Sequence, residues 1–403
     1  MDLLEPMVQP YAWGSRTAIA ELQGRQVPSP EPEAELWMGA HPSAPSVVER
    51  PDGRTTLEAV IAADPAGELG AECVEKFGGR LPFLLKVLAA EKALSIQVHP
   101  SRKQAEAGFA EENARGLAAG AAGRNYVDDW PKPEMLFALT RFEMLAGMRS
   151  AADAGELFAA LAVPELTRIA AELTAGSAEN SSAALTRALA TLLSWPLAQR
   201  SALIAAVVEA CERLAIGGGP YSAACAATVR IAGDHPGDMG IVASLLLRHV
   251  VLTPGQAVFM RAGGLHAYLH GTGIELMANS DNVVRAGLTG KHIDIPELLK
   301  LTDPSIGLPL IEGQDLGNGV AVYESPAPEF RLYRAELGAA AVALPADGPR
   351  LVLCVAGSVS LTSADGAALK TARGESCFLS AADGQVRAAG PGVIFIATTG
   401  IDE

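Results

Sequence analysis

Hydrophobic and polar side chains alternate with a period of two along residues 94–100, which read LSIQVHP. Because a β-strand points successive side chains to opposite faces, this pattern predicts a strand whose polar face carries Gln97 and His99 side by side. The preceding run, residues 81–88, is apolar except for Lys86 and predicts a second, buried strand. The amine of Lys86 either reaches the edge of the core or, when desolvated, has a lowered pKa and can act chemically.

The same patterns divide the chain into β-rich and helical parts. Residues 1–150 and 250–318 read mainly as strands and turns, whereas residues 151–249 keep the apolar spacing of amphipathic helices. Residues 319–403 consist of short β-rich runs between turn signals. Helices predicted outside the helical part cover residues 55–63, 67–77, 103–115 and 296–301. We therefore predict a mainly β protein, with a helical domain inserted in a first β domain and an antiparallel sandwich or barrel after it.

Length and charge exclude several classes of protein. With 403 residues the chain can form two or three domains, and no apolar run approaches the about 20 residues that a membrane helix needs. The formal net charge of −15 argues against nucleic acid or an anionic membrane as a partner, since both require a basic surface. A small anionic substrate would require a local cluster of basic side chains.

The cysteines and the first residues indicate the cytoplasm. The 5 cysteines are odd in number and widely spread, without the paired spacing of a disulfide framework or a zinc knuckle, so we expect reduced thiols. The start of the sequence, MDLLEPMVQPYAWG, lacks the basic start and apolar core of a signal peptide.

A carboxylate is expected close to a basic side chain in the stretch PKPEMLFAL. Its prolines, Pro131 and Pro133, prevent a helix and place Glu134 at the start of a strand predicted over residues 135–139, beside Lys132. A second motif follows later in the chain. Residues 255–266 fit Gly-x5-Arg-x-Gly-x2-His, which is similar to the second sequence motif of cupins, the small jelly-roll barrels that hold a metal with inward-facing histidines.

Combined with the strand at residues 94–100, these motifs predict a metal site. Two imidazoles, a carboxylate and an amide oxygen suit Zn²⁺ with one position left for water or substrate. The candidate ligands are Gln97, His99, Glu134 and His266. No histidine follows His292, so we expect no such metal site in residues 319–403.

Several segments together resemble the type I mannose-6-phosphate isomerases: YAWGS, ELWMGAHPSAPS, LSIQVHP, KPEMLFAL and HAYLHGTGIELMANSDNVVRAGLTGKH, which follow in chain order between Tyr11 and about Leu299. The resemblance implies two cupin-type jelly-roll barrels plus a helical domain. The catalytic barrel would comprise residues 1–150 and 250–318, interrupted by helices at 151–249, and the C-terminal barrel, matched only in pattern, residues 319–403.

The resemblance also implies an activity. A member of this family is a zinc-dependent aldose-ketose isomerase that interconverts mannose 6-phosphate and fructose 6-phosphate through an enediolate intermediate. We expect one Zn²⁺ per chain, a sugar phosphate as the small-molecule partner, no nucleic acid or membrane partner, and a monomer or weak homo-oligomer. The pathways implied are carbohydrate metabolism and GDP-mannose biosynthesis.

By the same resemblance, roles fall on particular residues. The zinc ligands would be Gln97, His99, Glu134 and His266. The residues expected to act in catalysis are Arg285, Lys86, Lys132 and Glu275. Those expected to bind the substrate are Ser95, Tyr268, Asp281 and Lys291.

Each role has a structural alternative. Arg285 could hold the phosphate or stabilise the enediolate, or it could simply pair with Asp281. Glu275 is a candidate base or an orienting hydrogen-bond partner. Lys86 and Lys132 could supply positive potential and move protons, or only neutralise the nearby carboxylates. We expect the remaining histidines to be structural or exposed at the surface: His41, His235, His249, His270 and His292.

The sequence departs from the family at several positions. The family usually carries Asn-His before Lys-Pro-Glu, where this chain has Trp130 and Pro131. Leu276 replaces a common cysteine, and Gly290 replaces a proline. These changes affect the assignment of acid and base more than the metal site.

Two other functions stay open from the residues alone. A bicupin that binds a sugar phosphate without chemistry would need the two histidines but has no use for the cluster of lysines and arginine. Another cupin metalloenzyme, such as an oxygenase, would prefer Fe(II) held by two histidines and one carboxylate, and the added amide ligand argues against it.

Overall fold

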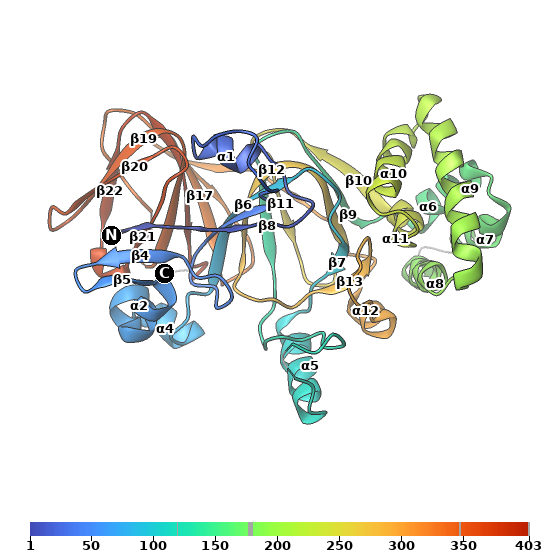
Figure 1. The fold of residues 1–403 in the computed structure, drawn as a ribbon, viewed down its shortest axis with the longest axis horizontal. Coiled ribbons are helices and arrows are strands. Elements are labelled where there is room, and N and C mark those ends of the chain that lie inside the picture. Colours follow the sequence, from blue (N-terminus) through green and yellow to red (C-terminus); the bar gives the residue numbers. More distant parts are fainter. Residues whose placement is uncertain (119, 176–179, 346–347, 402–403) are drawn as a thin grey trace.

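The computed structural model describes residues 1–118, 120–175, 180–345 and 348–401. Two β-sheet structures lie side by side, and a group of helices packs at the far end of the first one (Figure 1). The predicted fold class, mainly β with a helical insertion, is confirmed. The first sheet stands between the second sheet and the helices, so it is the part of the fold that contacts both neighbours (Figure 1).

The first sheet is built around one long strand, β12 (His266–Ala278). Its second half pairs with β6 and β8, whereas its first half pairs with β7 and β9, so β12 joins the two faces of the barrel. The strands of this sheet are β2 (Met7–Gln9), β3 (Glu35–Met38), β6 (Phe83–Ala90), β7 (Ile96–Val98), β8 (Glu134–Ala138), β9 (Phe142–Met148), β10 (Leu247–Leu252), β11 (Ala257–Met260), β12, β13 (Val284–Gly287) and β14 (Leu310–Ile311).

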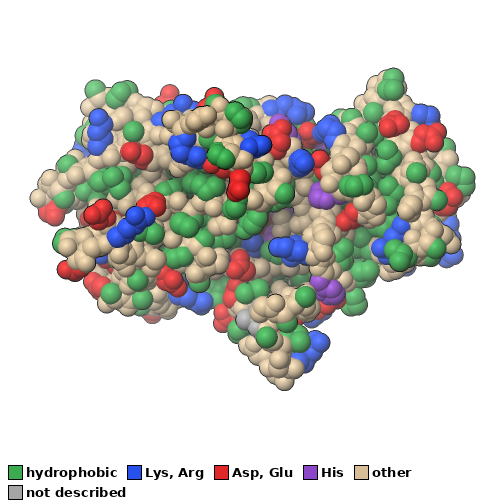
Figure 2. Space-filling view, viewed as in Figure 1, with side chains coloured by type: hydrophobic (Ala, Val, Ile, Leu, Met, Phe, Trp, Pro, Cys, Tyr) green, Lys and Arg blue, Asp and Glu red, His purple; other side chains and the backbone are tan. Residues whose placement is uncertain are grey.

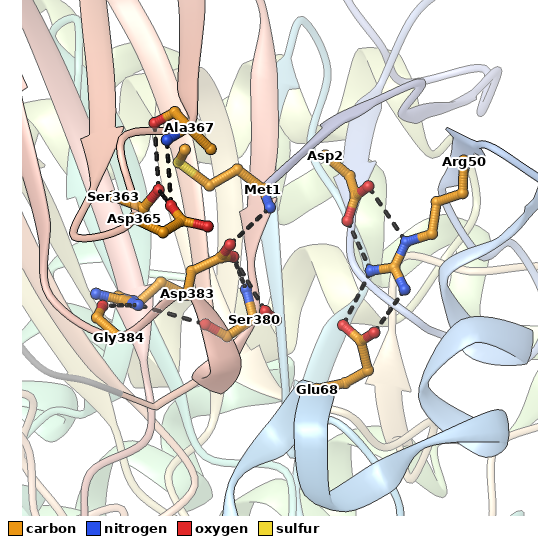
Figure 3. A network of polar contacts seen from close by, with 11 residues as sticks. Met1, Asp2, Arg50, Glu68, Ser363, Asp365, Ala367, Ser380, Asp383 and Gly384 are labelled. Atoms are coloured by element: carbon orange, nitrogen blue, oxygen red, sulfur yellow. Dashed lines mark hydrogen bonds and ion pairs between the residues drawn. The ribbon is translucent and has the colours of Figure 1, made fainter.

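The second sheet contains most of the C-terminal strands and one from the start of the chain. β1 (Asp2–Leu4) pairs with β21, and Met1 adds an ion pair of 2.9 Å from its amine to Asp383 (Figure 3). The strands are β1, β15 (Gln314–Gly317), β16 (Val320–Tyr323), β17 (Arg331–Leu337), β18 (Val342–Ala343), β19 (Arg350–Ser363), β20 (Ala368–Ala372), β21 (Ser376–Leu379), β22 (Val386–Ala389) and β23 (Gly392–Thr398). A separate hairpin is formed by β4 (Val47–Arg50) and β5 (Gly53–Thr56).

The two sheets share one hydrophobic core. Phe137 of β8 meets Tyr323 and Phe395 of the second sheet edge to face, with ring centroids 5.2 and 4.8 Å apart. Such aromatic pairs add about 0.5–1.5 kcal/mol beyond the burial of their surface. The first and second sheets are therefore fixed to each other by buried apolar contacts.

Helices form at the stretches predicted from apolar spacing, but α1 (Ala18–Leu22) lies in a segment predicted to form strands and turns. The stretch predicted as one helix at 67–77 is two helices, because Gly70 between them has a φ of +83°, which ends the first helix. Outside the insertion the helices are α1 (Ala18–Leu22), α2 (Leu57–Ala63), α3 (Pro65–Leu69), α4 (Ala71–Phe77), α5 (Arg102–Ala114), α12 (Ile295–Leu301) and the 3₁₀ helix η4 (Ala381–Asp383).

The helical insertion closes against the strand that carries Arg285. A Cβ on Gly287, at the end of β13, would lie 2.6 Å from Cα of Gly240 in α11, so the two backbones touch. Asp238 secures this contact by accepting hydrogen bonds from the backbone N–H groups of Gly240 and Thr289. The insertion comprises α6 (Ala151–Leu161), η1 (Pro164–Leu166), α7 (Thr167–Thr174), α8 (Ser181–Leu193), α9 (Leu197–Ile216), α10 (Ser222–Asp234), α11 (Gly240–Ala243) and η3 (Ser244–Leu246).

Among the described residues, no single helix is long and apolar enough to cross a membrane. The helices α8 and α9 reach the required length and hydropathy only as a pair, and they are bent by 112° relative to each other.

Candidate active site

A cavity of about 550 Å³ opens on the first sheet, next to the helical insertion. Figure 2 shows basic, acidic and histidine side chains intermixed on this face, where the sheet meets the helices. All but two of the predicted site residues line the cavity: Lys86, Ser95, Gln97, Lys132, Glu134, Tyr268, Glu275, Asp281, Arg285 and Lys291. The remaining two, His99 and His266, lie against Glu134 and are at most 1% exposed.

His99, Glu134 and His266 converge at one wall of the cavity. Nε2 of His99 lies 3.3 Å from Oε1 of Glu134, and Nε2 of His266 lies 3.2 Å from Oε2 of the same carboxylate. Strand geometry produces this grouping, because Glu134 begins β8, His266 begins β12, and His99 directly follows β7. One ligand atom from each residue lies within 4.8 Å of the others, which is the spacing that a bound metal ion requires.

The hydrogen bonds of both histidines leave a lone pair for a cation. Nδ1 of His99 donates to the backbone carbonyl of Asn282 at 2.9 Å, and Nδ1 of His266 donates to that of Gly264 at 3.1 Å. Each Nε2 is buried without a hydrogen-bond partner, although it faces a carboxylate oxygen. Burial also lowers the pKa of His99 and favours the neutral imidazole that metals bind. The three residues therefore fit a metal ion.

Gln97 lies next to this group. In the middle of β7 it is opposite His266 on one side and Arg285 on the other, and its side chain lines the cavity. Of the two residues that the alternation in LSIQVHP predicted on one face, Gln97 lines the cavity, whereas His99 is buried against Glu134. An amide oxygen at this place can complete a four-ligand set for Zn²⁺.

Lys86 is a buried cation surrounded by carboxylates. Its Nζ lies 3.2 Å from Oε2 of Glu275, 3.5 Å from Oε2 of Glu35 and 4.9 Å from the ring centroid of Trp37. Burial alone would lower the pKa of Lys86, but Glu35, Glu275 and Glu134 raise it above its ordinary value. Of the alternatives given for Lys86, this environment favours the one in which the amine pairs with nearby carboxylates over the one in which desolvation lowers its pKa.

Glu275 has the environment of a carboxyl group with reduced acidity. Burial raises its pKa, Glu134 and Glu35 raise it further, and Lys86 opposes them. Tyr268 donates a hydrogen bond of 2.8 Å from its hydroxyl to Oε1 of Glu275, while Lys86 holds Oε2. The carboxyl group is therefore fixed in position at the cavity.

Arg285 and Lys291 bring two positive charges to the cavity. In the described parts of the chain neither side chain forms a salt bridge, and Asp281 pairs instead with His41, whose Nε2 is 3.4 Å from Oδ1. The charge of Arg285 lowers the pKa of Lys291, and burial lowers the pKa of Arg285. Two cations this close, without an acidic partner, form a site for an anion.

Several cavity residues were not found from the sequence. Asp234 and His235 come from the end of α10 in the insertion, where His235 bonds the carbonyl of Ala93 at 2.7 Å. The aromatic side chains of Tyr11, Trp13 and Trp37 and the carboxylate of Glu35 also line the cavity. Their segments, YAWGS and ELWMGAHPSAPS, carried the family resemblance but no chemical signal of their own.

The remaining histidines and Trp130 do not line the cavity. Of the two alternatives for His41, structural or exposed, the structure shows the structural one, because His41 is 3% exposed and is a buried partner of Asp281. His249 bonds Glu143 at 2.5 Å, and His270 is exposed. The indole of Trp130 packs between the guanidinium groups of Arg80 and Arg102, at 4.3 and 5.1 Å, so the departure from the family at this position is a buried structural contact.

Fold and site together define a cupin-type protein with two barrels, a buried His-Glu-His group that fits a metal, and a cavity suited to an anionic ligand. The family model for the phosphomannose isomerase type I catalytic domain matches residues 1–151. Mannose-6-phosphate isomerase from Escherichia coli (strain K12) is 38% identical over 401 residues, covering 97% of this chain and 98% of that protein. The Bos taurus enzyme is 32% identical over 407 residues, covering 94% and 93%.

Solved structures agree with these sequence relatives. The K86A mutant of phosphomannose isomerase from Salmonella typhimurium superposes with a TM-score of 0.89, at 34% identity and over 100% of both chains. A zinc-bound mannose 6-phosphate isomerase superposes with a TM-score of 0.88, at 34% identity and over 99% of both chains. The chain belongs to the type I phosphomannose isomerase family.

Proposed function

We propose that this protein is a zinc-dependent aldose-ketose isomerase that interconverts mannose 6-phosphate and fructose 6-phosphate. The observation that carries the proposal is a metal-type His-Glu-His group at the wall of the cavity that Arg285 and Lys291 also line, two cations that form no salt bridge among the described residues. A cavity of about 550 Å³ is large enough to enclose a small ligand such as a hexose phosphate. Membership of the family gives the same substrate class.

The metal would be held by His99, Glu134 and His266, with Gln97 as the fourth ligand. When bound there, Zn²⁺ supplies a Lewis acid next to the sugar oxygens and stabilises the negative charge that develops on them. Lys132, whose Nζ is 3.7 Å from Oε1 of Glu134, adds positive charge at the same place.

The anionic end of the substrate is assigned to Arg285 and Lys291. Both side chains line the cavity, and among the described residues neither forms a side-chain hydrogen bond or salt bridge, so their donors can bind phosphate or enediolate oxygens. Ser95 and Asp281 line the same space and are assigned to hydroxyl groups of the sugar.

Glu275 is the candidate base for the proton on C2. In the open-chain aldose, removing that proton moves the electron pair of the C2–H bond into a C1–C2 double bond and the π pair of the C1 carbonyl onto O1, which leaves an enediolate. A proton passes from O2 to O1, and returning a proton to C1 then forms the C2 carbonyl of the ketose. Lys86 and Tyr268 hold both oxygens of the Glu275 carboxyl group in place, and its raised pKa brings it closer to that of an effective general base near neutral pH.

An isotope experiment tests the proposed reaction. Mannose 6-phosphate deuterated at C2 is incubated with zinc-loaded protein and followed by NMR. We expect fructose 6-phosphate with at least part of the deuterium exchanged into solvent, because the proton passes through a protein group. A chelator should abolish the reaction and Zn²⁺ should restore it. Zinc-loaded, folded protein that forms no fructose 6-phosphate would leave only the binding function.

The cellular setting and the division into domains complete the proposal. We assign the enzyme to the cytoplasm, as a monomer or weak homo-oligomer, and the burial of all its cysteines as free thiols supports a reducing compartment. We divide the chain into a catalytic barrel (1–150 and 250–318), a helical insertion (151–249) and a C-terminal barrel (319–403). By strand pairing, β1 and β15 lie with the C-terminal sheet, which adds two short pieces to that barrel.

A further inference from the structure

A buried asparagine connects two loops that border the cavity. Asn282 is fully buried, and its side-chain oxygen accepts hydrogen bonds from the backbone N–H groups of Val127 at 2.8 Å and Asp128 at 3.3 Å. Its side-chain amide donates to the carbonyl oxygens of Asp128 and Trp130, both at 2.8 Å. One side chain thus both accepts hydrogen bonds from the turn at residues 127–130 and donates hydrogen bonds to it.

This turn leads directly to the metal group. Pro131 and Pro133 follow it, and proline fixes φ, so the position of the turn is passed along a stiff chain to Lys132 and Glu134. Glu134 carries both carboxylate oxygens that face the two histidines.

The backbone of the same asparagine orients a second metal-type residue. The carbonyl oxygen of Asn282 accepts the hydrogen bond from Nδ1 of His99, which fixes the tautomer with Nε2 directed at Glu134. The backbone carbonyl of Asn282 therefore orients His99 directly. Its side chain orients Glu134 indirectly, by holding the turn at residues 127–130.

Asp128 and Ser280 complete the connection to the substrate side. The Asp128 carboxylate accepts hydrogen bonds from the hydroxyl of Ser280 at 2.8 Å and from the backbone N–H of Asp281 at 2.9 Å. Asp281 lines the cavity, and β13 with Arg285 begins shortly after it. The loops at residues 127–130 and 280–282 thus fix the metal-binding residues in position relative to the residues assigned to the substrate.

We propose that Asn282 is a positioning residue that sets the geometry of the metal ligands without touching the metal or the substrate. It does not line the cavity. Its backbone carbonyl bonds His99, and its side chain holds the turn at residues 127–130, which leads to Glu134. This inference rests on the proposed metal site but not on the identity of the sugar substrate.

The test compares two asparagines of one loop. Asn282→Ala is expected to weaken zinc binding by about 10- to 100-fold, the usual effect of losing a partner that orients a metal ligand. Asn279→Ala is the matched control, since the Asn279 amide donates only to the carbonyl of Leu81, at 3.2 Å, and contacts neither turn 127–130 nor His99. Zinc affinity is measured on metal-free protein by competition with a chromophoric chelator.

Further readouts separate positioning from general stability. In the Co²⁺-substituted protein, Asn282→Ala should change the visible absorption spectrum, which reports ligand geometry, whereas Asn279→Ala should not. With saturating zinc, kcat should fall more than KM rises, since no substrate contact is lost. If Asn282→Ala does not fold, the nearly isosteric Asn282→Asp decides in the same way, because it keeps an acceptor for the N–H groups of Val127 and Asp128 and removes the donors to the carbonyl oxygens of Asp128 and Trp130.

The results distinguish failure of this inference from failure of the proposed function. Folded Asn282→Ala protein with the zinc affinity and Co²⁺ spectrum of the wild type would overturn the inference and leave the proposed function intact. A wild-type protein that binds no zinc would overturn both.

Discussion

Lys86 and Glu275 lie directly opposite each other on β6 and β12, and Nζ of Lys86 is 3.2 Å from Oε2 of Glu275. The side chains are only 6% and 4% exposed, and the same ammonium group is 3.5 Å from Glu35. One ammonium group is therefore shared by two carboxylates where little water is present. This pairing keeps the candidate base at the cavity and controls how readily it binds a proton.

Replacing Lys86 by methionine should alter both stability and the pH profile. Removing one partner of a buried ion pair costs about 3–5 kcal/mol, measurable by urea unfolding. The pKa of Glu275, already raised, should rise further, so the acidic limb of kcat/KM should move to higher pH. Lys300→Met, which removes an exposed ammonium group, is the control. An unchanged acidic limb would mean that Glu275 is not the titrating base.

Replacing Gln97 should weaken zinc binding, whereas replacing Ser95 should not. Gln97→Ala is expected to weaken zinc binding, though less than His99→Ala, because an amide oxygen is a weaker ligand than an imidazole nitrogen. Ser95→Ala, two residues earlier on the same face of the segment, should keep the zinc affinity of the wild type. Equal zinc affinity in Gln97→Ala and wild-type protein would show that the fourth position is filled by another group.

Replacing Arg285 should lower turnover without changing zinc binding. Arg285→Ala is expected to keep its zinc, because the guanidinium is not a ligand, and to lose roughly 10²- to 10³-fold in kcat, as is typical when one preorganised donor to the transition state is removed. Arg261→Ala, which changes an exposed arginine outside the cavity lining, should turn over normally. Normal turnover of Arg285→Ala would contradict its proposed role.

The local parts of the site follow from sequence patterns. The alternation in residues 94–100 predicts Gln97 and His99 as neighbours because strand periodicity is a property of the backbone. The prolines around Lys132 likewise place Glu134 at a strand start, as found. These features depend on residues close together in the sequence, and so they could be predicted.

Features of the site that depend on contacts between residues far apart in the sequence could not be predicted from local sequence patterns. The sign of the pKa shift of Lys86 depends on Glu35 and Glu275, which come from strands far apart in the chain. His235 reaches the cavity only because the insertion docks on Ala93, 142 residues away. The role inferred for Asn282 depends on contacts with a turn that lies more than 150 residues earlier.

Glu143 should make the attachment of the helical insertion sensitive to acid. It accepts hydrogen bonds from His249 of β10 and from Arg230 of α10, and despite burial, which opposes the shift, these groups lower the pKa of Glu143 to about 2. An unfolded glutamate has a pKa of about 4.3, so the stabilisation is complete above that pH and is lost as the pH falls towards 2.

Glu143→Gln should therefore lower the free energy of unfolding at pH 7 by about 1–3 kcal/mol, and this difference from the wild type should shrink between pH 4 and 2. Glu172→Gln, at an exposed helix pair, should show neither effect in the same urea series. A Glu143→Gln difference that stays constant with pH would show that the carboxylate's charge does not hold the two parts together.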